Sequence, residues 1–210
     1  MRRALSFLFV TAFVPVLFAQ DTEFIQALER AQAQRPAALT SSARIAPTSE
    51  PGTPLVIHGQ VFNEDGRSPL AGATVFAYHT DRGGLYDKPG SPPHSWRLRG
   101  WAKADAQGRF EFSTIRPGSY PNTNNPAHVH FTVFTDEARY HAGGLQFADD
   151  SLISASERAR DKSEGEFGSV RPVRTEGGTQ HVDLRLRINS RNRFGRRSRW
   201  CAGCRRRRGW

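Results

Sequence analysis

Short runs of alternating apolar and polar residues fill the chain between residues 55 and 188, with turn-forming residues between them. The strongest run is Ala127–Thr135 (AHVHFTVFT), in which apolar residues alternate with His and Thr. Such alternation predicts strands with one buried face. The other predicted strands are Leu55–Asn63, Ala73–His79, Trp101–Ala104, Arg109–Ser113 and Gln180–Ile188. Short strands separated by turn signals favour an all-β fold, a β-sandwich, over an α/β fold.

Segments of different composition flank this β-rich region. Thr22–Gln34 has apolar residues on one helical face and predicts a short amphipathic helix. Residues 35–54 are rich in Pro, Ala, Ser and Thr, which is typical of a linker. Residues 189–210 alternate Arg with Ser, Asn, Gly and Trp, and predict a disordered tail because they bury little apolar surface. We therefore expect a helix and linker at residues 21–54 and a β-sandwich domain at residues 55–188.

An apolar run follows two basic residues at the N-terminus. Arg2 and Arg3 precede Leu5–Ala19, which is shorter than the roughly 20 apolar residues needed to cross a bilayer. This order is typical of an export signal that is cleaved. We therefore expect residues 1–20 to be a signal peptide of a periplasmic or secreted protein, with no stable membrane insertion after cleavage.

The formal net charge of +10 is concentrated at the two ends of the chain. Residues 1–20 carry +2, residues 189–210 carry +9, and residues 21–188 are left with −1. A nearly neutral domain lacks the basic surface that nucleic-acid binding requires. The sequence therefore predicts no nucleic-acid partner for the folded part.

Two histidines lie two residues apart on the strongest predicted strand. Because alternate side chains of a strand point to the same face, His128 and His130 should project together, opposite the apolar Val129. The polar side of a solvent-facing edge strand would give the same pattern, and this alternative stays open. Two tyrosines, Tyr86 and Tyr120, lie in loops rich in Gly and Pro. Loops on a rigid sheet often carry function, so these tyrosines are candidates to join the histidines.

Two imidazoles and two phenols would form a mixed nitrogen and oxygen ligand set. Imidazole suits Zn, Cu, Fe or Ni. A phenol has a pKa of about 10, so it binds near neutral pH only where a strongly Lewis-acidic ion displaces its proton. This requirement favours Fe(III) over Zn(II), although a copper or zinc hydrolytic site that uses the histidines alone stays a further alternative. Asp149 and Asp150 are another candidate metal pair, but a solvated turn is the better interpretation.

Several short motifs, in their order and spacing, resemble the intradiol ring-cleavage dioxygenases, particularly the protocatechuate 3,4-dioxygenase type. The matching stretch runs from His58 to about Phe134. Its motifs include Pro69–Val75 (PLAGATV), Asp105–Phe112 (DAQGRFEF), Thr114–Pro121 (TIRPGSYP) and Pro126–Phe131 (PAHVHF). The resemblance implies a transthyretin-like or immunoglobulin-like β-sandwich with long active-site loops.

The resemblance also implies a metal site and a reaction. The ligands of a non-haem Fe(III) ion would be Tyr86, Tyr120, His128 and His130. The substrates would be O2 and a catechol-type ring, opened between its two hydroxyls to a muconate-type diacid. In this family the catechol displaces one tyrosine, here Tyr120, which would make it a catalytic residue. A reading from a different class stays open: a non-catalytic transthyretin-like β-sandwich that binds another molecule at its surface.

Two positions depart from the family pattern. An Arg usually lies three residues before the first histidine ligand and supports the substrate, whereas this chain has Asn125. A Gln near the substrate aligns with Gly144, although Gln146 is close by. Arg97 and Arg99 are candidates to bind an anionic substrate carboxylate instead.

Overall fold

The computed structural model describes residues 17–92 and 94–194, and it divides the chain into two compact units, residues 1–34 and 35–210. The described part of the first unit is helix α1 (Leu17–Ala33). The predicted amphipathic helix is therefore confirmed, although it begins earlier than expected. Most of the predicted signal peptide lies outside the described residues. None of the described helices is both long and apolar enough to cross a membrane.

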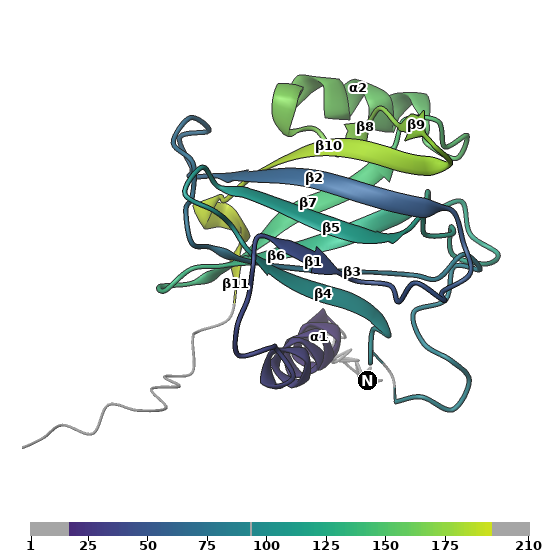
Figure 1. Cartoon of the computed structure of the whole chain (residues 1–210), viewed down its shortest axis with the longest axis horizontal. Coiled ribbons are helices and arrows are strands. Elements are labelled where there is room, and N and C mark those ends of the chain that lie inside the picture. Colours follow the sequence, from purple (N-terminus) through teal and green to yellow (C-terminus); the bar gives the residue numbers. More distant parts are fainter. Residues whose placement is uncertain (1–16, 93, 195–210) are drawn as a thin grey trace, which may run out of the picture. The chain divides into compact units, whose positions relative to one another are not determined.

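The second unit contains two β-sheets (Figure 1). The first sheet has the strand order β1-β5-β2-β10-β9, and the second has the order β11-β7-β6-β3-β4, with β8 paired to β7. The strands are β1 (Ser42–Arg44), β2 (Pro54–Phe62), β3 (Thr74–His79), β4 (Leu98–Lys103), β5 (Arg109–Ile115), β6 (His128–Phe134), β7 (Arg139–Phe147), β8 (Val170–Arg171), β9 (Arg174–Glu176), β10 (Thr179–Arg187) and β11 (Arg193–Phe194).

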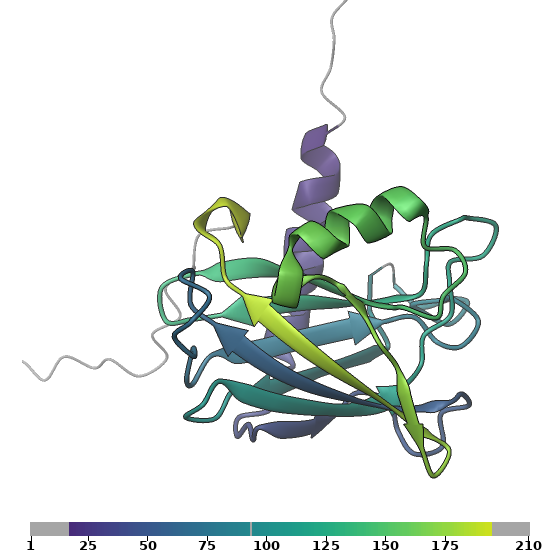
Figure 2. The ribbon, with the colours of Figure 1, turned by 90° about the horizontal axis from the view of Figure 1, so that it is seen from above.

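One α-helix and two short 3-10 helices join these strands in the second unit. Helix α2 (Ala155–Ser163) lies beside β10 in two perpendicular views (Figures 1 and 2). It begins with a capping box, in which the Ser154 side chain and Glu157 each bond the other's backbone N–H. The 3-10 helices are η1 (Gly165–Phe167) and η2 (Ser190–Asn192). The structure is thus mostly β, as the pattern of the chain predicts.

Each predicted strand corresponds to an observed one, but the long strand β7 and the short strands β1, β8, β9 and β11 were not predicted. Strand β7, of nine residues, contains Gly143 and Gly144, and its pairing with β6 shifts in register between His130 and Thr132. Both features break the regular alternation on which the prediction depends. The sequence pattern therefore missed the strand that lies next to the two histidines.

Residues 35–54 do more than link the helix to the domain. Strand β1 pairs in parallel with β5, and Ile45 and Ala46 are buried in the hydrophobic core. The linker prediction was wrong here because composition gives no sign of pairing with residues that lie far along the chain.

The beginning of the predicted disordered tail also has regular structure. Strand β11 pairs with β7, and the ring of Phe194 stacks on His141 with 3.9 Å between centroids. The prediction of disorder was therefore wrong for residues 190–194, because a single aromatic side chain can anchor a short polar segment on a sheet that is already formed. Residues 195–210 lie outside the described residues.

Apolar side chains from both sheets form one hydrophobic core. On β6, three alternate residues are buried in it: Val129, Phe131 and Val133. Full burial of each such side chain contributes roughly 1.5–3 kcal/mol to stability. His128 and His130 therefore face away from the core, as predicted. Strand β6 lies between β7 and β3, so the edge-strand alternative for the histidine pattern is wrong.

Candidate metal centre

The four predicted ligands come from one strand of the second sheet and two loops. His128 and His130 lie on β6. Tyr86 lies in the loop between β3 and β4, and Tyr120 lies in the loop between β5 and β6. The sheet fixes the histidines, whereas the positions of the tyrosines depend on how the two loops fold.

The donor atoms of all four side chains converge. The Tyr86 hydroxyl lies 2.8 Å from His130 Nε2 and also contacts the Tyr120 hydroxyl. The Tyr120 hydroxyl lies 3.0 Å from His128 Nε2 and 3.5 Å from His130 Nε2, and the two Nε2 atoms are 2.9 Å apart. Ligands held about 2.0–2.2 Å from one ion at right or tetrahedral angles lie roughly 2.8–3.6 Å from each other. The four oxygen–nitrogen and nitrogen–nitrogen separations, between 2.8 and 3.5 Å, therefore fit a single shared ion, whereas the two hydroxyls lie closer together than two bound ligands would.

A second hydrogen bond fixes the tautomer of His128. Its Nδ1 lies 2.7 Å from the carbonyl oxygen of Pro126. Because a carbonyl only accepts, Nδ1 carries the hydrogen and the Nε2 lone pair points at the other donors. Metal-binding histidines usually have such an outer partner, which fixes the orientation of the ring.

Burial determines the protonation of the remaining groups. Burial, followed by the neighbouring His128, lowers the pKa of His130 to about 3, so its imidazole is neutral at pH 7. Burial also raises the pKa of both Tyr86 and Tyr120 above the usual phenol value. The phenols therefore keep their protons until a cation compensates the cost of a buried negative charge. This donor set favours an ion of high charge.

An aromatic stack supports His130 from the neighbouring strand. Tyr78 on β3 pairs in register with His130, and their rings stack with 4.7 Å between centroids and 13° between planes. Trp96 stacks on the same tyrosine with 4.2 Å between centroids. Sequence analysis did not single out Tyr78. This tyrosine alternates with Ala77 on a predicted strand, on the same face as Phe76, whereas the two candidate tyrosines were chosen because they lie in loops.

The two tyrosine loops pack backbone against backbone. The Gly118 N–H donates to the carbonyl of Asp81 at 2.8 Å. A Cβ at Gly118 would lie 2.4 Å from the carbonyl oxygen of Arg82, and a Cβ at Gly84 would lie 1.9 Å from that of Ser119. Both positions therefore need glycine, and this close approach sets the distance between the two hydroxyls.

Arg97 holds the Tyr86 loop. Its guanidinium donates to the two carboxylate oxygens of Glu50 at 2.5 and 2.8 Å, and it lies 3.5 Å from Asp81. The hydrogen bond with Glu50 raises the pKa of Arg97 and lowers that of Glu50. The Arg97 backbone N–H donates to the carbonyl of Tyr86. The charge of Arg97 is therefore already paired within the chain, which disfavours the expected substrate-binding role.

The positions that depart from the family pattern lie in different elements, strand β7 and the loop between β5 and β6. Gln146 on β7 is directly opposite His128, and Gly144 is opposite His130. Directly opposite residues of an antiparallel pair project to the same face, so Gln146 shares the histidine face. Asn125 is exposed in the Tyr120 loop. Of the two polar residues, Gln146 is therefore the one that strand pairing places on the histidine face.

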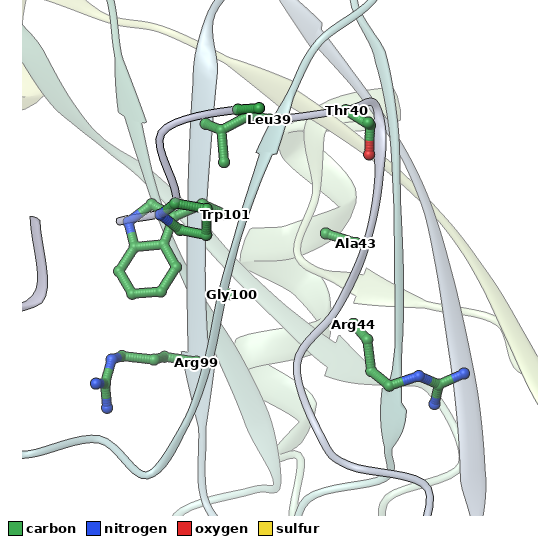
Figure 3. A pocket seen from close by; sticks show the side chains of 9 residues that line it. Leu39, Thr40, Ala43, Arg44, Arg99, Gly100 and Trp101 are labelled. Atoms are coloured by element: carbon green, nitrogen blue, oxygen red, sulfur yellow. The ribbon is translucent and has the colours of Figure 1, made fainter. Parts of the chain in front are cut away.

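A cavity of about 290 Å³ lies elsewhere in this unit, between residues 36–44 and β4 (Figure 3). Its lining includes Trp101, Arg44 and Arg99, whose guanidinium groups extend in opposite directions (Figure 3). Two backbone carbonyls, those of Ser95 and Trp96, accept hydrogen bonds from Arg99. None of the four converging donors lines this cavity. The candidate metal centre is thus a separate site.

Solved structures show the same fold. The dioxygenase domain of a dioxygenase and carbohydrate-binding protein fusion from Streptomyces sp. SirexAA-E superposes with a TM-score of 0.54 and 24% identity, over 73% of this chain and 91% of that one. An intradiol ring-cleavage dioxygenase from Tetranychus urticae superposes with a TM-score of 0.53 and 21% identity, over 73% and 89%. The fold is therefore the all-β fold of intradiol dioxygenases.

Sequence comparison gives the family. Residues 30–176 match the family model described as Dioxygenase, and the chain belongs to the intradiol dioxygenase family. It is 36% identical over 131 residues to catechol 1,2-dioxygenase 1 of Acinetobacter lwoffii, covering 54% of this chain and 42% of that protein. It is 30% identical over 131 residues to the protocatechuate 3,4-dioxygenase beta chain of Burkholderia cepacia, covering 53% and 54%. The chain thus spans about half the length of these relatives.

Proposed function

We propose that this protein is an exported, non-haem Fe(III) dioxygenase that opens catechol-type rings between their two hydroxyls with O2. The product would be a muconate-type diacid. The observation that supports this most strongly is the convergence of two phenol oxygens and two imidazole nitrogens at separations that suit one ion. A surface that only binds a partner has no need of four such donors, so the convergence favours an enzyme over a non-catalytic module.

The residues present fit ferric iron, and intradiol dioxygenases as a family use non-haem iron. The ion would be held by Tyr86, Tyr120, His128 and His130. When bound, Fe(III) would supply the Lewis acidity that turns both phenols into phenolates and makes the catechol reactive toward O2. His130 presents a neutral imidazole because burial keeps it unprotonated, and the Pro126 carbonyl orients His128 so that its Nε2 faces the other donors.

The two tyrosines differ in how firmly they are held. The Tyr86 ring packs against Tyr78, with 5.7 Å between centroids, inside the aromatic stack that supports His130. The Tyr120 ring contacts His128 edge-on and is followed by an exposed loop tip, residues 121–125. Tyr120 is therefore the tyrosine that can leave when a catechol binds, and its oxygen can accept a proton from a substrate hydroxyl as it leaves. Tyr86 would keep its position.

The export signal at residues 1–20 and a β-sandwich domain at residues 55–188 are parts of the same proposal. Arg2 and Arg3 ahead of a short apolar run support export. The core that both sheets share supports a sandwich of the transthyretin or immunoglobulin type. Localisation is tested by fractionating cells that express the full chain and detecting the protein in each fraction. Protein confined to the cytosol would refute export.

The test of the activity is the colour and turnover of the purified full chain. Phenolate ligands on Fe(III) absorb visible light, so protein expressed with ample iron should be red, hold one iron per chain, and open the ring of catechol or protocatechuate. His128→Ala should lose iron and colour. His181→Ala is the matched control, because His181 is on the other sheet, where it contacts His58. Colourless protein with stoichiometric zinc would refute the ferric assignment.

A further inference from the structure

The loop that carries Tyr120 is fastened at both ends by two adjacent acidic residues. At its start, the guanidinium of Arg116 donates to both carboxylate oxygens of Asp149, each at 2.8 Å. At its end, the N–H of Ala127 donates to the Asp150 carboxylate at 2.8 Å. Ala127 immediately precedes His128 on β6. One turn after β7 thus holds both ends of the segment that places a tyrosine and a histidine.

The turn that provides these two carboxylates is itself well fixed. The N–H of Asp150 donates to the carbonyl of Phe147 at 2.8 Å, and the N–H of Leu152 donates to the Asp150 carboxylate at 2.9 Å. Arg158 of α2 donates to the carbonyls of Ala148 and Asp150 at 3.0 and 3.1 Å. The two carboxylates are therefore anchored to β7 and α2.

The bond between Arg116 and Asp149 is more than an ordinary surface ion pair. Exposed pairs contribute little to stability unless their geometry is bidentate or they belong to a network. Here the geometry is bidentate, and the Arg116 side chain is only 21% exposed. Its guanidinium lies over the Phe147 ring at 4.4 Å and within 3.4 Å of Gln180. The hydrogen bond from Arg116 also lowers the pKa of Asp149, so the pair stays charged at neutral pH.

We propose that Asp149 and Asp150 are positioning residues for Tyr120, acting through Arg116 and Ala127. They fix the ends of the loop while its tip, residues 121–125, stays exposed. The Tyr120 hydroxyl is thereby held beside the imidazoles, yet the loop keeps the freedom that a leaving tyrosine needs. This inference rests on the proposed function for the role of Tyr120, but the loop fastening can be tested without iron.

The Tyr86 loop is held by a different set of contacts, those of Arg97 with Glu50 and Asp81. Loss of the Asp149 and Asp150 contacts should therefore affect Tyr120 more than Tyr86, although the Gly118 N–H bond to Asp81 joins the two loops. A misplacement of about 1 Å in a reacting group can cost about 10²-fold in rate. We expect Asp149→Ala to lower kcat by roughly 10- to 100-fold, with a shifted visible band and unchanged iron content.

The experiment compares iron content, visible spectrum, kcat and KM for wild type, Asp149→Ala and Arg116→Lys. Arg116→Lys keeps the charge but loses the bidentate geometry, so it should show a smaller loss in kcat. The double variant Arg116→Asp with Asp149→Arg should recover part of kcat. Arg174→Gln is the matched control, since it breaks an ion pair with Asp183 on β10, and it should leave kcat and the spectrum unchanged. Wild-type kcat and spectrum in Asp149→Ala would overturn the inference.

Amide hydrogen exchange in the metal-free protein separates this inference from the proposed function. Asp150→Ala should speed exchange at residues 118–127 more than in the Tyr86 loop, whether or not the wild-type protein turns over catechol. Unchanged exchange at residues 118–127 would overturn the fastening role. Absence of iron from the wild-type protein would instead refute the proposed function and leave the exchange result to decide the role of the two aspartates.

Discussion

A single methyl group at Gly118 should separate the two tyrosine loops. The Cβ of Gly118→Ala would lie 2.4 Å from the Arg82 carbonyl oxygen and 2.8 Å from the Gly84 nitrogen. Ordinary contacts begin at 3.4 Å, so the loops must move apart by about 1 Å. The contacting atoms belong to backbone and cannot rotate away. Overpacking of this kind typically costs about 1–3 kcal/mol of stability.

The same change should also lower the rate of the reaction. The Tyr120 hydroxyl would move away from the imidazoles, and a displacement of about 1 Å corresponds to roughly 10²-fold in rate. We expect Gly118→Ala to fold, to bind iron more weakly, and to lose about 10²-fold in kcat/KM. The assay is ring opening of catechol in iron-loaded protein, with circular dichroism and thermal unfolding to confirm the fold.

Gly83→Ala is the matched control, because it lies in the Tyr86 loop and its added Cβ would meet only the Asp81 side chain, at 3.3 Å. This variant should keep nearly full activity. Wild-type kcat/KM in Gly118→Ala would show that the loops tolerate the separation and would refute the reasoning. Equal losses of kcat/KM in both glycine variants would show that any added methyl group in either loop is harmful. The backbone contact of Gly118 would then not be the cause.

Three further predictions concern other parts of the molecule. Tyr120→Phe should retain iron but turn over about 10²–10⁴-fold more slowly. Tyr86→Phe should instead weaken the visible band both before and after substrate is added. Full activity in Tyr120→Phe would contradict the role of Tyr120 as a proton acceptor. Truncation after Phe194 should leave iron content and activity intact. Truncation after Ile188 should lower the melting temperature because it removes β11. Identical melting temperatures for the two truncated proteins would show that β11 adds no stability. Burial lowers the pKa of His79 to about 4, so the unfolded chain binds the proton first as the pH falls. Stability should therefore drop by up to about 3 kcal/mol between pH 6.5 and 4. Urea unfolding of wild type and His79→Gln checks this, and an equal pH dependence in both would rule out His79 as the cause.

The sequence predicted the strand that carries the histidines and the direction in which they point. Val129 and Phe131 alternate with His128 and His130, and period-two alternation is a local property of any strand with one buried face. The family motifs also singled out Tyr86 and Tyr120, which the structure brings to the same point. What the sequence could not show was that β6 lies inside the sheet, because this depends on its pairing with β3 and β7.

Local patterns failed wherever a residue works through a partner that lies far along the chain. Arg97 was a candidate substrate ligand until the structure paired it with Glu50, 47 residues earlier, in a segment that composition assigned to a linker. Asp149 and Asp150 were interpreted as a solvated turn, and only the folded chain shows that they hold Arg116 and Ala127.

The sequence by itself determined the β-rich core and the four donor side chains, because alternation and motif spacing depend only on the order of residues along the chain. The tertiary structure decided the distances between those donors and the contacts that fix each loop. The separation of the Tyr86 and Tyr120 hydroxyls depends on the close packing of Gly84 and Gly118. Contacts of this kind join segments about 35 residues apart, and they form only after the sheet has brought the segments together.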